Sequence, residues 1–294
     1  MVKDRNRAVA AAMEVAAALD LAVTDAIVLH ESNRLAVRLL PCDVLARVAV
    51  ARFRRSAEFE VGLAQRLAEA GAPAGAPEPR AAPVAYVRDG YVVTLWTYYE
   101  PAPGLTLADY AHALERLHAC MRRIDTPTPH FTYRVSEAQR LVADRALTPA
   151  LVDADRAFLS DTLQSLRQAV IARGRPEQLL HCEPHPGNAL RTKQGVLFID
   201  LETCCRGPVE FDLAHAPEEV AAHYAGADQP LIRECRILML AMVAAWRWDR
   251  NDQFPNGAQA ARDYVSALRV AVSGGPVVAP GLPAWDGSAA APPR

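Results

Sequence analysis

One segment, residues 181–200, combines several reactive side chains at a spacing that is rare in loops. It begins with His181-Cys182-Glu183-Pro184-His185-Pro186-Gly187-Asn188 and ends with Val196-Leu197-Phe198-Ile199-Asp200. Two short apolar stretches flank Thr192-Lys193-Gln194-Gly195, a pattern that predicts a loop followed by a β-hairpin. Any fold for this chain must therefore hold a loop and a hairpin that carry two carboxylates, an amide and two imidazoles.

The predicted register of the hairpin brings its polar residues together. Pairing Arg191 with Val196 across the turn places Asn188 opposite Ile199, next to Asp200. An amide oxygen and a carboxylate side by side are hard ligands that suit Mg²⁺ holding phosphates. The carboxylate of Glu183, on the loop just before, suits a base that receives a hydroxyl proton.

Composition narrows the class of protein. The 294 residues are 51% hydrophobic and 22% charged, which is typical of an ordinary globular protein of one large domain or two lobes. The net charge of −2 offers no bulk attraction to nucleic acid or to a membrane surface. The six cysteines show no metal-binding spacing, and no signal peptide or membrane span is evident, so we expect reduced thiols and a cytoplasmic location.

The first hundred residues predict a small α+β lobe. A helix over 4–20 precedes three β-branched-rich runs at 26–30, 35–40 and 44–50. Ser56 is a plausible N-cap for a helix that ends at Gly71. Arg88-Asp89-Gly90 then joins two further strands, 84–87 and 91–99. Together these elements predict a five-stranded antiparallel sheet with two helices.

After a Pro/Gly break at 98–104 the chain becomes mainly helical. Predicted helices lie near 105–121, 136–145, 149–173, 209–224 (in two pieces, broken near Pro217), 230–248 and 258–272. The last segment, 274–294, is rich in Gly, Pro and Ala and is expected to be a flexible tail. The fold class predicted is α+β, with the bilobal layout of a kinase.

Acidic residues dominate the segment from His181 to Asp228. Eight acids (Glu183, Asp200, Glu202, Glu210, Asp212, Glu218, Glu219 and Asp228) face three basic residues (Arg191, Lys193 and Arg206). This imbalance predicts an acidic cleft and favours a cationic acceptor over an anionic one.

Three motifs in this region resemble the aminoglycoside phosphotransferase family of small-molecule kinases. They are His181-x-Glu183-x-x-x-x-Asn188, then Ile199-Asp200-x-Glu202, then Gly207-Pro208-x-Glu210-Phe211-Asp212-Leu213-Ala214. The resemblance covers roughly residues 25–250. It implies ATP bound between two lobes, Mg²⁺ as cofactor, and phosphoryl transfer to a hydroxyl of a small-molecule acceptor.

Carried over by position, the resemblance assigns a role to individual residues. Asn188 and Asp200 become the Mg²⁺ ligands, Glu183 the base, and Arg47 with Glu60 the pair that binds nucleotide phosphates. Further nucleotide contacts are Ser32 and Asn33 in the loop over the phosphates and Trp96, Tyr98 and Tyr99 at the hinge. Candidate acceptor contacts are His185, Glu202, Asp212, Glu218 and Glu219. The lobes become a nucleotide-binding lobe at 1–97, a hinge at 98–104 and a helical lobe at 105–273.

Two residues depart from the family pattern. The family base is normally aspartate where this chain has Glu183, and its strand-three lysine is replaced by Arg47. One extra methylene moves a carboxylate by ~1.5 Å, and a misplacement of about 1 Å can cost roughly a hundredfold in rate. A nucleotide-binding pseudokinase is therefore the alternative to an active phosphotransferase. A protein kinase is disfavoured because no activation-loop segment follows Asp200.

Overall fold

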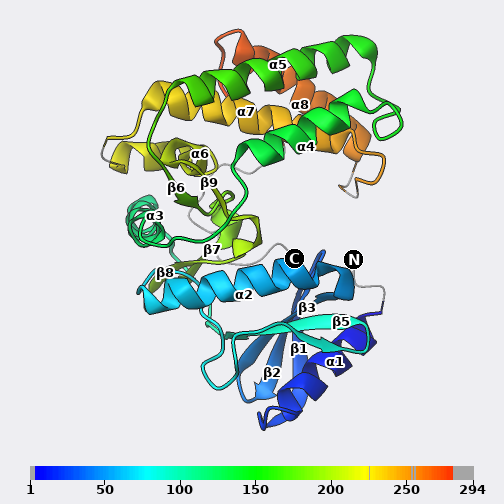
Figure 1. Ribbon diagram of the computed structural model, residues 1–294, viewed down its shortest axis with the longest axis vertical. Helices are drawn as coiled ribbons and strands as arrows, with labels where there is room; N and C mark the ends of the chain where they lie inside the picture. Colours follow the sequence, from blue (N-terminus) through cyan, green and yellow to red (C-terminus); the bar gives the residue numbers. More distant parts are fainter. Residues whose placement is uncertain (1–3, 225, 253, 255, 281–294) are drawn as a thin grey trace. The chain divides into compact units, whose positions relative to one another are not determined.

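The computed structural model describes residues 4–224, 226–252, 254 and 256–280 (Figure 1). Contacts divide the chain into two compact units. The first comprises the described part of Met1–Asp125 together with His185–Thr203, and the second comprises Thr126–Pro184 and the described part of Cys204–Asp286. No helix among the described residues is both long enough and apolar enough to cross a membrane.

The first unit is built on a five-stranded antiparallel sheet, as the sequence predicts. The strand order in the sheet is β1-β2-β3-β5-β4. Its strands are β1 (Val23–Glu31), β2 (Leu35–Pro41), β3 (Val44–Val50), β4 (Tyr86–Arg88) and β5 (Tyr91–Thr97). Two helices accompany it, α1 (Arg5–Ala17) and α2 (Arg54–Glu69). The short 3-10 segment η1 (Ala51–Phe53) connects β3 to α2.

Side chains alternate between the two faces of this sheet because successive residues of a strand point in opposite directions. One face packs against α1 and forms an apolar core with Leu35, Val37, Leu39, Val44, Ala46, Val48, Val93 and Leu95. The opposite face carries the intervening residues Ala36, Leu45, Arg47 and Trp96, which line a cavity. The alternation of apolar residues therefore leaves one face of the sheet for a ligand.

The predicted cap of α2 is wrong. The helix begins at Arg54 with Phe53 as its N-cap, and no side chain caps it. The hydroxyl of Ser56 instead donates to Glu202, 2.9 Å away, and accepts from Arg34. The serine lies inside the first turn and serves the polar cluster described below.

The hairpin of residues 189–198 belongs to the first unit and has the predicted register. Strands β7 (Ala189–Thr192) and β8 (Gly195–Phe198) pair Arg191 with Val196. The backbone N–H of Ile199 donates to the carbonyl of Asn188 at 2.9 Å, so the ladder extends to the pair next to Asp200. Short 3-10 segments flank the hairpin, η2 (Pro186–Asn188) before it and η3 (Leu201–Thr203) after it.

Helix α3 (Leu107–Met121) also packs within the first unit, although the sequence places it after the hinge. Thr106 caps it by accepting from the N–H of Asp109 at 3.1 Å. Tyr110 is fully buried, and its ring meets the ring of Phe198 edge-on at 5.3 Å between centroids. Side-chain contacts, and not the Pro/Gly break at 98–104, therefore decide which unit this helix joins.

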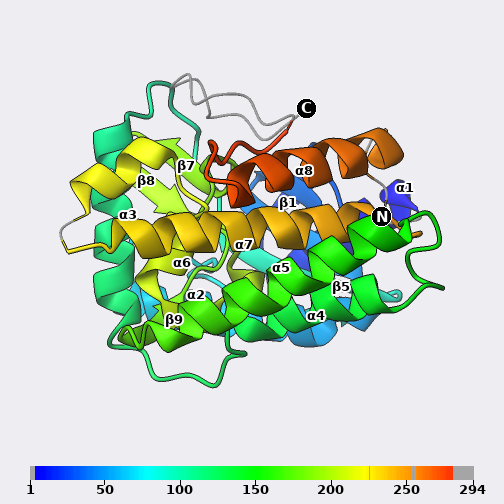
Figure 2. The ribbon, with the colours of Figure 1, turned by 90° about the horizontal axis from the view of Figure 1, so that it is seen from above.

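The second unit is mainly helical. Its helices are α4 (Thr132–Ala143), α5 (Asp153–Ala172), α6 (Val209–Leu213), α7 (Gln229–Arg247) and α8 (Gly257–Val272), with the 3-10 segment η4 (Glu218–His223). Strands β6 (Glu177–Leu180) and β9 (Cys205–Pro208) form a two-stranded antiparallel ribbon. Figure 2 shows α5, α7 and α8 running alongside one another, which agrees with their contacts.

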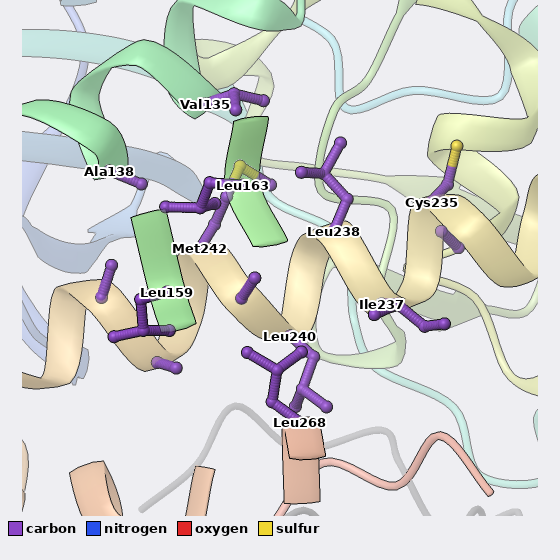
Figure 3. Close-up of a cluster of buried hydrophobic side chains, with 14 of the residues drawn as sticks. Val135, Ala138, Leu159, Leu163, Cys235, Ile237, Leu238, Leu240, Met242 and Leu268 are labelled. Carbon is purple, nitrogen blue, oxygen red and sulfur yellow. The ribbon is translucent and has the colours of Figure 1, made fainter. Parts of the chain in front are cut away.

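Helix α7 is the centre of the second core. Asp228 caps it by accepting from the N–H of Leu231 at 3.0 Å, and Pro230 occupies its first turn, where no N–H is needed. Leu238 and Met242 of α7 point toward Leu159 and Leu163 of α5 (Figure 3). The apolar stripe that predicted this helix is therefore its buried face.

Only the beginning of the predicted tail lies in the described residues. Arg233 of α7 donates to the carbonyls of Ala271 and Gly275 at 3.0 and 2.8 Å. Residues 281–294 lie outside the described residues, so the predicted flexibility of 274–294 stays a prediction.

Candidate functional site

A cavity of about 460 Å³ lies within the first unit, lined by the sheet and by residues 185–201. Its apolar lining includes Leu29, Ala36, Leu45, Ala76, Trp96 and Ile199. The polar residues Arg34, Arg47, Asn188 and Asp200 also line it. A mostly apolar cavity with a few convergent polar groups is typical of a small-molecule site.

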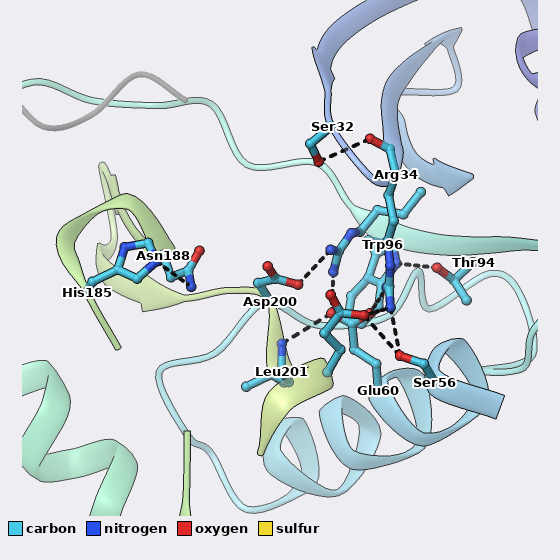
Figure 4. Close-up of polar contacts among 12 residues, drawn as sticks. Ser32, Arg34, Ser56, Glu60, Thr94, Trp96, His185, Asn188, Asp200 and Leu201 are labelled. Atoms are coloured by element: carbon cyan, nitrogen blue, oxygen red, sulfur yellow. Dashed lines mark hydrogen bonds and ion pairs between the residues drawn. The ribbon is translucent and has the colours of Figure 1, made fainter. Parts of the chain in front are cut away.

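A chain of alternating charges runs along this cavity (Figure 4). Arg47 pairs with Asp200 at 2.8 Å and, through its other terminal nitrogen, with Glu60. Arg34 pairs with the second oxygen of Glu60 and also with Glu202. The order is therefore Asp200, Arg47, Glu60, Arg34, Glu202, with three carboxylates and two guanidinium groups.

Glu60 is the centre of this chain of ion pairs. Its side chain is fully buried, and both of its oxygens are bound by arginines. The N–H of Leu201 also donates to it at 3.2 Å, which ties helix α2 to the residue after Asp200. A buried carboxylate of this kind is stable only because its charge is compensated on every side. Glu60 therefore fixes the position of Arg47 and the segment that carries Asp200.

The charges of the cluster shift two pKa values. Burial lowers the pKa of Arg47, but the attraction of Glu60 and Asp200 outweighs it, so the pKa lies above its usual value. Burial raises the pKa of Glu202, and the neighbouring charge of Arg34 opposes this shift only in part. Arg47 is thus a permanent cation that faces the cavity.

Asn188 and Asp200 are brought together as predicted. Asp200 adopts a left-handed backbone conformation with φ of 67°, which is uncommon outside glycine and often marks a functional position. The amide nitrogen of Asn188 lies 3.3 Å from Nε2 of His185. This contact directs the nitrogen toward the imidazole, and the amide oxygen occupies the other branch of the side chain.

The side chains of Asp200 and Asn188 fit a magnesium ion that is also bound by phosphate groups of a substrate. No group of three or more His, Cys, Asp or Glu side chains suited to a metal occurs among the described residues. A carboxylate from Asp200 and an amide oxygen from Asn188 are nevertheless the hard donors that Mg²⁺ prefers. Mg²⁺ keeps several waters and is bound by one or two protein groups plus substrate phosphates, so two protein donors are sufficient.

The loop and hinge residues are only partly engaged with the cavity. Ser32 lines it, and its N–H donates to the carbonyl of Arg34 at 2.9 Å in a tight turn; Asn33 is exposed and is not part of the lining. Trp96 is buried, and its indole N–H donates to Thr94 at 2.8 Å. Tyr98 and Tyr99 both line the cavity.

Glu183 lies in the second unit, in a loop with a firmly held backbone. The carboxylate of Asp212 accepts the backbone N–H groups of His181 and Cys182, both at 2.8 Å. Cys182 has a φ of 76°, a left-handed conformation that costs about 1–3 kcal/mol for a non-glycine residue. The carboxylate of Glu183 pairs with Arg134 of α4. The backbone of the loop that carries Glu183 is therefore held in place by the buried side chain of Asp212.

The sequence matches the family model of the phosphotransferase enzyme family over residues 27–237. The chain belongs to this family. The resemblance noted from the motifs is thereby confirmed. No curated protein sequence matches the chain.

Solved structures show which fold the chain has. The amicoumacin kinase hAmiN in complex with AMP-PNP, Ca²⁺ and Ami has a TM-score of 0.70 and 12% identity, covering 91% of this chain and 96% of its own. The choline kinase LicA from Streptococcus pneumoniae has a TM-score of 0.65 and 14% identity, covering 89% and 97%. The GDP and kanamycin complex of APH(2")-IIia has a TM-score of 0.64 and 13% identity, covering 89% and 97%. The fold is therefore the bilobal α+β fold of a kinase, as predicted.

The candidate acceptor residues of this family member fall into three groups. Asp212 is fully buried, and its two oxygens accept the backbone N–H groups of His181 and Cys182. His185 lines the cavity of the first unit, whereas Glu202 is not part of the lining and is held by Ser56 and by Arg34, a lining residue. Glu218 and Glu219 are exposed in η4, and Glu218 lies 3.7 Å from Arg236.

The prediction of an acidic cleft counted charges only between His181 and Asp228, and it left out arginines from other segments that pair with these acids. Glu202, Asp200, Glu183 and Glu210 pair with Arg34, Arg47, Arg134 and Arg175 respectively. All four arginines lie outside the segment in which the acids were counted, and the fold brings each to its partner. The local excess of acids therefore overstates the negative charge available to an acceptor.

Two arginines of the site, Arg34 and Arg134, were missed. Arg34 comes directly before Leu35, whose side chain lies on the core face of β2. Because successive residues of a strand point to opposite faces, Arg34 lies on the cavity face together with Ala36. That signal was available in the sequence. No comparable signal marks Arg134, which meets Glu183 only through the packing of α4.

The partly buried ring of His215 gives a pH prediction. Burial lowers its pKa to about 4, so the ring is neutral in the folded protein near pH 7. The unfolded chain, with an ordinary pKa of about 6.5, binds the proton first as the pH falls. We expect the free energy of unfolding to fall by about 1 kcal/mol from this residue between pH 7 and pH 5, allowing for the exposed part of the ring.

Urea unfolding at the two pH values checks this expectation. In the variant His215→Phe the loss between pH 7 and pH 5 should be smaller by that amount, whereas His223→Gln, at an exposed position of η4, should behave as the wild type. Equal pH dependence in all three proteins would contradict a buried neutral His215.

Proposed function

We propose that this chain is an ATP-dependent phosphotransferase that moves the γ-phosphoryl group to a hydroxyl of a small molecule. The observation that carries the proposal is the ion-pair chain of Arg47, Glu60 and Asp200 along the cavity, with Asn188 beside Asp200. Phosphoryl transfer depends on positioning and charge neutralisation, and this arrangement supplies both. The apolar wall formed by Leu45, Trp96 and their neighbours suits a nucleobase.

Each residue has a role in the proposed reaction. Arg47 binds the phosphates of the nucleotide, and Asn188 and Asp200 hold Mg²⁺. When bound, the ion neutralises charge on the phosphates. Glu183 accepts the proton of the acceptor hydroxyl while the new oxygen–phosphorus bond forms, and cleavage of the bond to the β-phosphate oxygen releases ADP.

The acceptor is proposed at the level of chemical class. A small molecule with a hydroxyl group is what the family fold and the proposed base require. The sequence predicts a cationic, aminoglycoside-like acceptor. The exposed carboxylates of Glu218 and Glu219 are the structural feature that supports this prediction.

The substitution Asp200→Asn tests the proposed metal site. Asparagine tolerates the left-handed backbone at this position, so the variant removes charge with little strain. We expect affinity for MgATP to fall by about 10–100-fold, to the level seen without metal, because a charged ligand is lost. Titration calorimetry with and without Mg²⁺ measures the change.

Asp43→Asn is a matched control. Asp43 also has a left-handed backbone, with φ of 60°, and also pairs with an arginine, Arg38, at 2.7 Å. It lies in the turn between β2 and β3 and does not line the cavity. MgATP affinity should be unchanged in this variant. Unchanged binding in Asp200→Asn as well would remove Asp200 as a metal ligand.

The second candidate function is nucleotide binding without turnover. The observation behind it is the replacement of the usual aspartate by Glu183, whose carboxylate pairs with Arg134. It predicts MgATP binding that is sensitive to Asp200→Asn, without loss of ATP in the presence of any acceptor.

A further inference from the structure

We infer that Arg134 is a positioning residue that holds the longer carboxylate of Glu183 in one place. The inference rests on the proposed function, in which Glu183 is the base. It accounts for how a glutamate can occupy a position where the family normally has an aspartate.

Arg134 is itself fixed from two sides. It lies in the first turn of α4 and pairs with Oε1 of Glu183. The central carbon of its guanidinium group lies 5.0 Å from the ring centroid of Trp246 in α7, within the range of a cation–π contact. Its side chain is 16% exposed. A planar cation held between an indole and a carboxylate has few alternative conformations.

Glu183 needs such a partner because its backbone alone does not place its carboxylate. Asp212 anchors the N–H groups of His181 and Cys182, so the loop itself is held. The glutamate has one more rotatable bond than an aspartate, and this bond leaves the carboxylate ~1.5 Å of additional reach. Its side chain is 28% exposed, so packing restricts it only in part. The ion pair with Arg134 supplies the missing restraint.

The groups around this pair favour a stable ion pair. Burial lowers the pKa of the Arg134 guanidinium, but the nearby Cys182 and Glu183 raise it further than burial lowers it, so its pKa lies above the usual value. His215, which interacts with both Glu183 and Arg134, is neutral near pH 7 and does not compete as a cation.

The experiment compares Arg134→Ala in two backgrounds. In the wild-type background we expect kcat to fall by about 10–100-fold, because a base misplaced by about 1 Å costs roughly a hundredfold. The dissociation constant for MgATP should stay unchanged. In the Glu183→Asp background the same substitution should lower kcat by less than about threefold, since the shorter side chain does not depend on the restraint. Arg134→Lys should give an intermediate kcat, because lysine keeps the charge but not the planar fork.

Arg269→Ala is the matched control. Arg269 of α8 also combines an ion pair, with Asp155 at 2.8 Å, and a cation–π contact, 4.2 Å above the ring of Phe158. It belongs to the same unit but does not contact Glu183. Its removal should affect thermal stability about as much as the removal of Arg134 while leaving kcat unchanged.

Two results would overturn the inference. Wild-type kcat in Arg134→Ala would do so, and so would an equal loss in both backgrounds, which would indicate a merely structural role. Failure of the proposed function is distinguishable from these: the wild type would then bind MgATP but consume none with any acceptor, and the positioning role would fall with it.

Discussion

Replacing Glu183 with glutamine is expected to lower turnover by about 10²–10⁴-fold, the usual contribution of a general base. Glutamine keeps the shape of the side chain but cannot accept the proton of the acceptor hydroxyl. Binding of MgATP should remain, because the proposed ligands Arg47, Asn188 and Asp200 are untouched. Steady-state ADP release with a panel of hydroxyl compounds, together with titration calorimetry, separates the two effects.

Glu183→Asp provides the comparison that assigns the role. The aspartate restores the usual residue of the family, and we expect turnover to be retained or improved. Equal rates for the wild type and Glu183→Gln would show that another group receives the proton or that none is needed.

Removing the carboxylate of Glu60 is expected to have the largest effect on stability. The substitution Glu60→Ala leaves Arg34 and Arg47 facing each other without the buried acid that both bind. Breaking a buried ion pair from one side typically costs about 3–5 kcal/mol. We expect about 3 kcal/mol, the lower end, because Arg34 keeps Glu202 and Arg47 keeps Asp200.

Urea unfolding measures this loss, with Glu58→Ala as the control. Glu58 lies on the same helix and pairs with Arg54 one turn away, but both side chains are exposed. Such surface pairs contribute about 0.3–0.5 kcal/mol. MgATP affinity should also fall in Glu60→Ala, because Arg47 loses the partner that orients it. Similar stabilities for the two variants would contradict the central place of Glu60 in the cluster.

Much of the fold was predictable because the patterns of apolar residues and turns along the sequence match the helices and strands that form. The strands of the first unit alternate between core and cavity, and the hairpin turn sets the register that brings Asn188 next to Asp200. Helix α7 follows from its apolar stripe and the cap at Asp228. The position of α3 was not predictable, because the contact of Tyr110 with Phe198 joins segments far apart in sequence.

The site was predictable in its motifs and less so in its electrostatics. The pairing of Arg47 with Glu60 could be expected from their places on a strand and the next helix. The buried position of Asp212 and the pairing of Glu183 with Arg134 could not, because both depend on tertiary packing. Counting acids along the chain failed for the same reason: the arginines that compensate them come from distant segments.

The most direct test of the central claim is detection of the product. Purified protein, MgATP and a panel of aminoglycosides, amino alcohols and sugars would be incubated and examined by mass spectrometry for a phosphate ester. The account predicts an ester and a matching amount of ADP with at least one acceptor, both absent in Asp200→Asn. MgATP binding without ester formation for every acceptor class would contradict it and identify the chain as a nucleotide-binding protein without turnover.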